Sequence, residues 1–289
     1  MPDRIALVVH PTRAVDNAMA TLAQWTEEHG VALVQLAVEG DGGRALAPAG
    51  TLQPDDLVLA LGGDGTVLSA LRAAAPGEAP VLGVACGSLG ALSAVKAGDL
   101  ASALDRVWAG DWTPRSLPAL AIDDGGGHPQ WAANDFVVVR RGAGQVVAEL
   151  SVDDELYARI AGDGLIVATA IGSSAYSMAA GGPVLAGGTR AFVCTPLAMH
   201  GGNAPPLVIP GDASATVVVQ PGFAGFDVEI DGHDRELAGP RFALSLHPDK
   251  LTLVTFTPSG RGLTGLRKRL LVIDSPRILA RDERGKRLR

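Results

Sequence analysis

The chain has 289 residues, of which 47% are hydrophobic, and a formal net charge of −7, which suits one large domain or two domains with cores of their own. It contains no run of about 18 uninterrupted apolar residues, and the charged start MPDRIALVVHPTR lacks the long apolar region of a secretory signal, so we expect a cytoplasmic protein without membrane partners. Cys86 and Cys194 stand far apart without CxxC spacing, which argues against a disulfide framework or a zinc site.

The first 115 residues alternate between apolar runs of strand length and helical patterns. Strands are predicted at residues 4–9, 32–38, 57–61 and 81–85, and helices at 17–29 and 100–108. Alternation of this kind is typical of a parallel sheet with helices on its faces. We therefore predict a Rossmann-like α/β domain over residues 1–115.

The most informative part of this domain is the turn GGDGT at residues 62–66, which follows the apolar run 57–61 directly. Glycines allow close backbone approach, and the free amides of the helix that follows favour an anionic group such as a phosphate. A carboxylate at Asp64 repels phosphate unless a metal bridges the two groups or the carboxylate takes a proton from an attacking hydroxyl. The turn therefore indicates phosphoryl chemistry, although an ordinary strand-to-helix turn with an Asp cap has the same residue types.

From residue 116 the sequence changes to short β-rich runs separated by turn signals. Strands are predicted at residues 119–122, 130–140, 146–152, 157–161, 165–169, 191–195, 207–209, 215–220, 228–230 and 251–256. Repeated short strands of this kind indicate a β-sandwich. We therefore predict an all-β sandwich C-terminal domain over residues 116–256.

The C-terminal segment, residues 257–289, differs from the rest in charge. Residues 261–289 hold ten Lys and Arg against three Asp and Glu, a local balance of +7 that leaves −14 for the remainder. A basic tail can bind nucleic acid or polyphosphate, but here the basic residues alternate with apolar ones in RKRLLVIDS. We expect a strand that returns to the N-terminal domain and a frayed end, with no nucleic-acid partner.

Two further segments carry groups suited to a nucleotide. The segment DGLIVATAIGSSAYSMAAGGP, residues 163–183, joins a strand to a helix expected to begin around Ser173 or Ser174 and to end at Gly181. Its serine hydroxyls can cap that helix or meet a base or ribose, and Tyr176 offers a ring for stacking. In QWAANDFVVV, the amide of Asn134 can contact an adenine edge, and the carboxylate of Asp135 can hold a ribose hydroxyl.

Together these motifs closely resemble the NAD kinase family, which shares its GGDGT core with the diacylglycerol and sphingosine kinases. The resemblance spans residues 4 to about 256. It rests on GGDGT at 62–66, GSLG at 87–90, ND at 134–135, the segment 163–183, TPLAMH at 195–200 and IDG at 230–232.

The resemblance implies phosphorylation of the 2′-hydroxyl of the adenosine ribose of NAD to give NADP. The phosphoryl donor would be ATP or inorganic polyphosphate, and Mg²⁺ or another divalent cation would be required. The family's fold, an α/β domain with a β-sandwich, agrees with the two domains predicted above. Its members assemble as homodimers or homotetramers, which the resemblance implies here as well.

The family's site residues are carried over by position. Asp64 would be the catalytic base. The substrate-binding and cofactor-binding residues would be Gly63 and Gly65 at the phosphates, Thr66 in the same turn, Asn134, Ser174 and Ala175 at adenine, Asp135 and Asp231 at the nicotinamide ribose, Tyr176 packed against the dinucleotide, Asp163 approaching a ribose from the neighbouring subunit, and His200 in the position of the family's PxxPH-like motif. No residue is assigned as a metal ligand, because neither His200 nor His233 has a second ligand at the required spacing.

The chain departs from the family pattern at five positions. Ile171 replaces a hydroxyl of the usual TPTGSTAY, Asp135 replaces Glu, Pro205 replaces Arg, and Cys86 and Ala91 replace the Asn and Phe of NxGxLGF. Lost hydrogen bonds can change which substrate is accepted. Two alternatives therefore stay open at this point: a kinase acting on another nucleoside or dinucleotide, and a non-catalytic NAD(P)-binding sensor.

Overall fold

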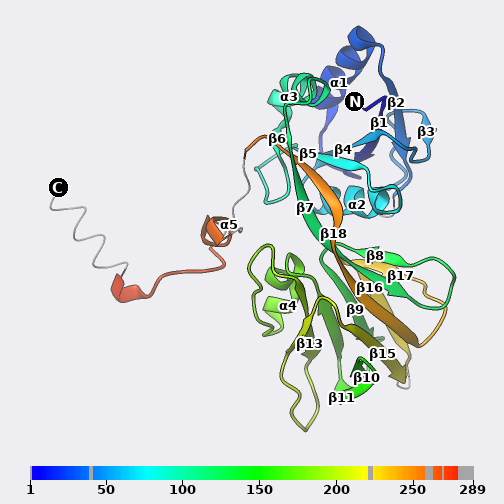
Figure 1. Cartoon of the computed structure of the whole chain (residues 1–289), viewed down its shortest axis with the longest axis vertical. Coiled ribbons are helices and arrows are strands. Elements are labelled where there is room, and N and C mark those ends of the chain that lie inside the picture. Colours follow the sequence, from blue (N-terminus) through cyan, green and yellow to red (C-terminus); the bar gives the residue numbers. More distant parts are fainter. Residues whose placement is uncertain (1, 39–41, 221–223, 258–262, 269, 279–289) are drawn as a thin grey trace.

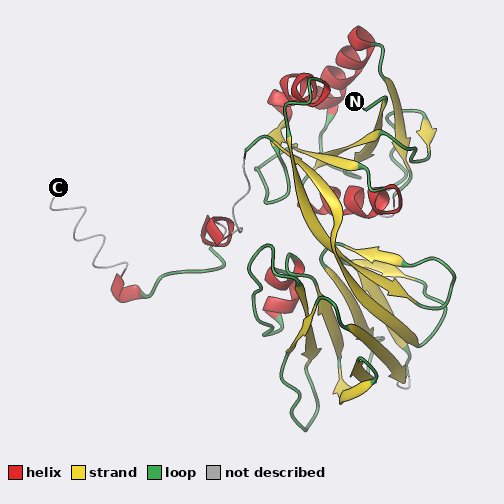
Figure 2. Cartoon of the chain, in the orientation of Figure 1, coloured by secondary structure: helices red, strands yellow, loops and turns green. Residues whose placement is uncertain are grey.

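The structure, a computed structural model, describes residues 2–38, 42–220, 224–257, 263–268 and 270–278. It has an N-terminal α/β half and a C-terminal half built almost entirely of strands (Figures 1 and 2). The predicted combination of an α/β domain with a β-sandwich is confirmed. Within the described residues, no helix has the length and apolar character needed to cross a membrane.

The N-terminal half is built on parallel strands in the order β5-β4-β1-β2-β3. All seven residues of β4 are buried, because a parallel strand covered on both faces has no solvent side to alternate with. The strands are β1 (Arg4–Val9), β2 (Ala32–Leu36), β3 (Ala49–Gly50), β4 (Asp56–Gly62), β5 (Pro80–Ala85) and the short β6 (Val95–Lys96), which pairs with β5.

Helices cover both faces of this sheet. On one face, α1 (Asp16–His29) and α3 (Leu100–Trp108) pack in one hydrophobic cluster, and on the other face α2 (Asp64–Ala74) packs in a second. Two short 3₁₀ turns, η1 (Ala75–Gly77) and η2 (Ala97–Asp99), flank these helices. Figure 1 shows α2 between the N-terminal sheet and the C-terminal domain. The helix that begins at Asp64 therefore faces the domain boundary.

Two long strands, β7 (Thr113–Asp123) and β18 (Arg241–Thr255), run through both halves and pair with each other (Figure 1). Through β18 the N-terminal strands join a continuous 12-stranded sheet, so the boundary near residue 115 is not a linker. The sequence predicted only the short pieces 119–122 and 251–256. Prolines such as Pro118 and Pro248 interrupt the apolar pattern, and the register shifts between His247 and Leu251.

The C-terminal sandwich consists of the far part of the large sheet and a six-stranded sheet of order β14-β13-β12-β9-β16-β17. Phe136, Phe192 and Phe242 are fully buried in the core of this half. Its other strands are β8 (Gln130–Ala132), β9 (Asp135–Arg140), β10 (Val146–Val152), β11 (Glu155–Gly162), β12 (Gly164–Ala168), β13 (Ala191–Leu197), β14 (Leu207–Pro210), β15 (Ser214–Gln220), β16 (Phe226–Ile230) and β17 (His233–Arg235).

Two predicted elements are divided in the structure. The strand expected over 130–140 breaks into β8, which belongs to the large sheet, and β9, which belongs to the six-stranded sheet. The break at Ala133 and Asn134 is therefore the point where the chain crosses between sheets. The helix expected up to Gly181 is a 3₁₀ turn, η3 (Gly172–Ser174), followed by the single-turn helix α4 (Tyr176–Ala179).

The C-terminal segment differs from its prediction. Leu263–Lys268 form the helix α5, and the described residues after it contain no strand. Leu270 and Ile273 are 71% and 67% exposed, so these side chains do not pack as the expected strand on the N-terminal domain. Residues 258–262, 269 and 279–289 of the predicted segment lie outside the described residues.

Candidate functional site

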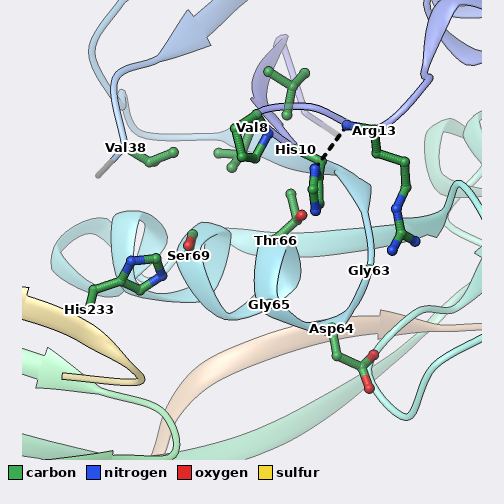
Figure 3. A pocket seen from close by; sticks show the side chains of 12 residues that line it. Val8, His10, Arg13, Val38, Gly63, Asp64, Gly65, Thr66, Ser69 and His233 are labelled. Carbon is green, nitrogen blue, oxygen red and sulfur yellow. Dashed lines mark hydrogen bonds between the residues drawn. The ribbon is translucent and has the colours of Figure 1, made fainter. Parts of the chain in front are cut away.

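The topology of the N-terminal sheet places a crevice between β1 and β4. The two strands are adjacent, and the chain leaves β1 through α1 on one face and β4 through α2 on the other. In open α/β sheets, ligands bind at the carboxyl ends of strands where the connections diverge in this way. A hollow of about 290 Å³ lies there, lined by the end of β1 and the residues after it, by the GGDGT turn and the start of α2, and by Val38 and His233 (Figure 3).

The GGDGT turn forms one wall of this hollow. Gly62 ends β4, Gly63 precedes the helix, and Asp64 is the first residue of α2. Gly63, Asp64, Gly65 and Thr66 all line the hollow. The first amides of a helix have no intrahelical acceptor and carry a partial positive charge. The predicted phosphate-binding turn therefore has the geometry of an anion site.

The Asp64 carboxylate is held by the second glycine turn of the sequence. Its two oxygens accept hydrogen bonds from the backbone N–H groups of Ala91, at 2.9 Å, and Leu92, at 3.0 Å. Gly90 lies so close that a Cβ at this position would overlap the carboxylate. The GSLG segment therefore orients the predicted base, and its glycine is required by this close approach.

Arg13 and His10 complete the other wall of the hollow, and neither residue was predicted from the sequence. A Cβ on Gly63 would lie 3.4 Å from Nη1 of Arg13, and one on Gly87 would lie 2.9 Å from it, so the guanidinium lies across both glycine turns. Nδ1 of His10 accepts the backbone N–H of Arg13 at 3.0 Å (Figure 3). The available signal was the segment HPTR, which follows the first strand directly.

The charges of the wall formed by His10 and Arg13 favour binding of an anion. Burial lowers the pKa of His10, and the positive charges of Arg13 and Arg44 lower it further. A neutral His10 is the acceptor that the Arg13 amide requires. The positive charge beside the glycine turns is therefore that of the Arg13 guanidinium, whose planar donors match phosphate oxygens.

The predicted dinucleotide residues Asn134 and Asp135 lie at the crossing between β8 and β9. The carbonyl oxygen of Asn134 accepts the N–H of Thr169 at 2.8 Å, and Gly172 packs against the same peptide so closely that a Cβ there would overlap it. Asn134 is half-buried, whereas Asp135 is only 5% exposed. The structure therefore brings the ND turn against the segment 169–172, as a shared site requires.

Burial raises the pKa of Asp135 to about 7, and the neighbouring carboxylates of Asp231 and Glu229 add to the shift. A carboxyl group in this state changes charge near neutral pH. Below about pH 7 it is protonated and can donate a hydrogen bond, and above that pH it only accepts. Titratable groups with such shifts cluster at functional sites.

Asp231 lies differently from its expected contact with a ribose. Its side chain has no exposed surface, and its oxygens accept the N–H groups of Ala133 at 3.0 Å, Asn134 at 2.6 Å and Asp135 at 3.0 Å. A carboxylate that is buried behind the turn and satisfied by three amides positions that turn. Its acceptor sites face the protein backbone and Arg72, and the expected contact of Asp231 with the nicotinamide ribose stays a prediction.

The residues after η3 divide into structural and accessible groups. Ser173 and Ser177 are fully buried and bond to the carbonyl of Ala170 and to Thr195, respectively. Ser174 donates its hydroxyl to the backbone carbonyl of Ile171, three residues earlier, at 3.1 Å, and no side chain caps η3 or α4. Ala175 is exposed and Tyr176 is 44% exposed, so both are accessible to a ligand.

The structure gives a physical reason for Ile171, which departs from the family pattern. Its side chain packs against the hydrophobic cluster formed by α2 and the neighbouring strands. Ala133 belongs to the same cluster and is fully buried. An apolar residue at position 171 therefore extends the contact between the two domains, where a hydroxyl would lose that packing.

Asp163, Tyr176 and His200 gather on the sandwich, apart from the first hollow. Asp163 and Tyr176 line a second hollow of about 280 Å³ that shares no lining residue with the first. The Asp163 carboxylate pairs with Arg140 at 2.5 Å and lies 4.0 Å from Nε2 of His200. Within one chain these three predicted residues therefore lie near one another, but they do not line the hollow that contains Asp64.

The described residues do not form a dedicated metal cage. In the described ranges no group of three or more His, Cys, Asp or Glu side chains is arranged to hold an ion. Asp64 is the one acidic residue that lines the first hollow within this part of the chain. Mg²⁺ sites built from one carboxylate and substrate phosphates fit such a surface, because that ion keeps waters and bridges phosphates.

Comparisons with known proteins agree with these observations. A family model described as the ATP-NAD kinase N-terminal domain matches residues 49–112, and one described as the ATP-NAD kinase C-terminal domain matches residues 118–244. An NAD kinase of Koribacter versatilis is 35% identical over 79% of this chain and 84% of its own length. An NAD kinase of Heliobacterium modesticaldum is 41% identical over 61% of this chain, and the match spans 64% of that protein.

Solved structures share the fold. Yeast NADH kinase complexed with NADH matches 95% of this chain and 89% of its own, with a TM-score of 0.76 at 18% identity. An NAD kinase from Archaeoglobus fulgidus in complex with ATP matches 90% of this chain and 97% of its own, with a TM-score of 0.67 at 22% identity. In both cases the similarity extends over the N-terminal and the C-terminal domain of this chain.

Proposed function

The chain belongs to the NAD kinase family, and on this premise we propose that it transfers the terminal phosphoryl group of ATP to the 2′-hydroxyl of the adenosine ribose of NAD, giving NADP. The observation that carries the proposal is the Asp64 carboxylate at the start of α2, which the backbone amides of Ala91 and Leu92 orient. The Arg13 guanidinium lies close to Gly63 and Gly87 and lines the same hollow. The hollow thus combines an acceptor for a hydroxyl proton with groups that attract phosphate.

In this reaction Asp64 acts on the acceptor hydroxyl. The ribose 2′-oxygen bonds to the γ-phosphorus of ATP, the bond from that phosphorus to the ADP oxygen breaks, and the hydroxyl proton passes to the Asp64 carboxylate. Phosphoryl transfer depends mainly on positioning and charge neutralisation. The two amides that orient Asp64, and the Arg13 charge beside the donor phosphates, supply these two effects.

The divalent cation belongs to the donor side of the proposal. When bound, Mg²⁺ would supply positive charge that offsets the negative charge of the donor phosphates. Asp64 is the residue of the first hollow that would hold it together with those phosphates. The chain's own contribution is to orient the carboxylate and to align the phosphates on the glycine turns.

The dinucleotide side of the proposal uses the ND turn and the segment after η3. Asn134, Ser174 and Ala175 would contact adenine, Asp135 a ribose, and Tyr176 the face of the dinucleotide. Asp163 lies with His200 away from the Asp64 hollow. We therefore propose a homodimer or homotetramer in which Asp163 of one subunit approaches a ribose bound by another.

The test is direct formation of NADP. Purified protein is incubated with NAD, Mg²⁺ and either ATP or inorganic polyphosphate, and NADP is measured with an NADP-specific dehydrogenase. We expect NADP with ATP, and a loss of about 10²–10⁴ in kcat for Asp64→Asn with an unchanged melting temperature. Absence of NADP with both donors while NAD still binds would reject the kinase proposal and favour a sensor or another acceptor.

A further inference from the structure

We propose that Arg72 is a positioning residue that joins the phosphoryl-transfer helix α2 to the ND turn and thereby sets the affinity for the dinucleotide. The inference deepens the proposed function and rests on it. Arg72 lies on α2, about two turns after Asp64. Its partner is Asp231, in the C-terminal domain, so this ion pair connects the two halves of the site.

The contact is a buried ion pair. Nη1 of Arg72 donates to Oδ2 of Asp231 at 3.0 Å, and Nη2 donates to Oγ of Ser69 on the same helix at 3.1 Å. The side chains of Arg72 and Asp231 are 9% and 0% exposed. A pair removed from water in this way is costly to break, because the remaining charge is left without compensation.

The backbone around Asp231 explains why its carboxylate points at the ND turn. Ile230 pairs with His233, so Asp231 and Gly232 form a two-residue hairpin turn between β16 and β17. Both residues have positive φ, at 50° and 76°, as a type I′ turn requires. The N–H of Asp231 also donates to the carbonyl of Asp135 at 2.9 Å, which ties the hairpin to β9 at this point.

The Asp231 carboxylate in turn fixes the backbone of the ND turn through hydrogen bonds. Three successive N–H groups, those of Ala133, Asn134 and Asp135, donate to it at 2.6–3.0 Å. Successive amides that converge in this way form a concave anion site. Here the anion is the protein's own carboxylate, so the backbone of the ND turn follows Asp231, and Asp231 is held by Arg72.

A direct role for Arg72 at a substrate phosphate is less consistent with the geometry. Its side chain is only 9% exposed, and two of the guanidinium nitrogens already bond to Asp231 and Ser69. Arg13, by contrast, lines the Asp64 hollow. Removing Arg72 would leave the Asp231 carboxylate uncompensated beside Asp135, whose own ionisation is already opposed by that neighbour. The ND turn would then shift relative to α2.

The experiment compares Arg72→Met with a matched control in the full-length protein. Arg4→Met removes another buried Arg–Asp pair, in which Arg4 and Asp56 lie 2.7 Å apart, but that pair lies within the N-terminal sheet at the strand ends opposite the site. We expect Arg72→Met to raise KM for NAD about tenfold or more, as misplacement of a bound reactant does, with KM for ATP within about twofold. Arg4→Met lowers the melting temperature and leaves both KM values unchanged.

The conservative variant distinguishes positioning from folding. Arg72→Lys keeps a positive charge beside the Asp231 carboxylate but loses the hydrogen bond to Ser69. We therefore expect this variant to fold and to retain most of the affinity for NAD. Unchanged KM for NAD in Arg72→Met, or equal rises of both KM values in Arg72→Met and Arg4→Met, would overturn the inference. If Arg72→Met does not fold, an unchanged KM for NAD in Asp231→Asn, which removes the charge on the other partner of the pair, overturns the inference.

Two separate measurements distinguish a failure of this inference from a failure of the proposed reaction. NADP formation by the wild type tests the reaction. NAD binding by calorimetry, compared between wild type, Arg72→Met and Arg4→Met, tests the positioning role even if no NADP forms. Weaker NAD binding in Arg72→Met alone supports the inference, and equal binding in all three proteins overturns it.

Discussion

The GGDGT turn and the ND turn are organised in opposite ways. At GGDGT, the polar groups line an open hollow, and the partners that orient Asp64 come from the next strand-to-loop connection of the same sheet. At ND, the polar groups are covered, and the group that orients the backbone, Asp231, lies almost a hundred residues later in the chain. The groups that orient Asp64 thus come from neighbouring strand ends of one sheet, whereas the ND turn depends on Asp231 and Arg72, which meet across the domain boundary.

If the donor side depends on local close approach, a methyl group at Gly90 should break it most strongly. Gly90→Ala places a Cβ where the Asp64 carboxylate lies, so the carboxylate must leave the amides of Ala91 and Leu92. We expect kcat to fall about 10²-fold. The control is Gly98→Ala, which meets nothing within 4 Å. Equal kcat in the two variants would show that the second glycine turn does not orient Asp64.

The next largest effect tests whether the ATP side and the NAD side of the site can be changed independently. Arg13→Ala removes the guanidinium beside Gly63 and Gly87 but touches nothing in the ND turn. A hydrogen bond to a charged group contributes about 1.5–3 kcal/mol, so we expect KM for ATP to rise about tenfold or more, with KM for NAD unchanged. Steady-state kinetics with each substrate varied in turn measures this, with the exposed Arg190→Ala as control. A matching rise in KM for NAD would contradict the separation.

The smallest effect concerns Asp135 and depends on pH. Its pKa of about 7 means that the ionised form grows from roughly a tenth to nine-tenths between pH 6 and pH 8. Ribose hydroxyls donate best to the ionised carboxylate, so KM for NAD should fall by up to about ninefold over this range. Asp135→Asn should flatten the profile, and an unchanged profile in that variant would assign the pH dependence to another group.

The same substitution has a stability readout with a defined sign. The folded protein keeps a proton on Asp135 between pH 3.8 and about 7, where the unfolded chain loses it. This group's contribution to the free energy of unfolding is therefore fully present below pH 3.8 and is lost progressively as pH rises to and through about 7. Denaturant titrations at pH 6 and pH 8 should show a smaller difference for Asp135→Asn than for the wild type.

Much of the donor side could be predicted from sequence, because its elements are short in range. Apolar runs and helix periodicity located β4, α2 and β5, and GGDGT between them indicated the phosphate turn. Arg13 was missed because a single arginine after a strand has no pattern that distinguishes it from a solvent-exposed residue. Its position across two glycine turns follows from the adjacency of β1 and β4, which the linear sequence does not state.

The acceptor side shows what only the tertiary structure decided. The sequence by itself determined the family, the two-domain architecture and the identity of the ND, GSSAY and IDG motifs, because these rest on local patterns and on residue types. It did not reveal that β7 and β18 carry one sheet through both domains, that the predicted strand 130–140 breaks at Asn134, or that Asp231 lies behind the ND turn with Arg72. A buried carboxylate takes its role from the donors that folding brings around it. Those donors come from α2 and from the turn between two sheets, so only the packing of the domains assigns Asp231 its partners.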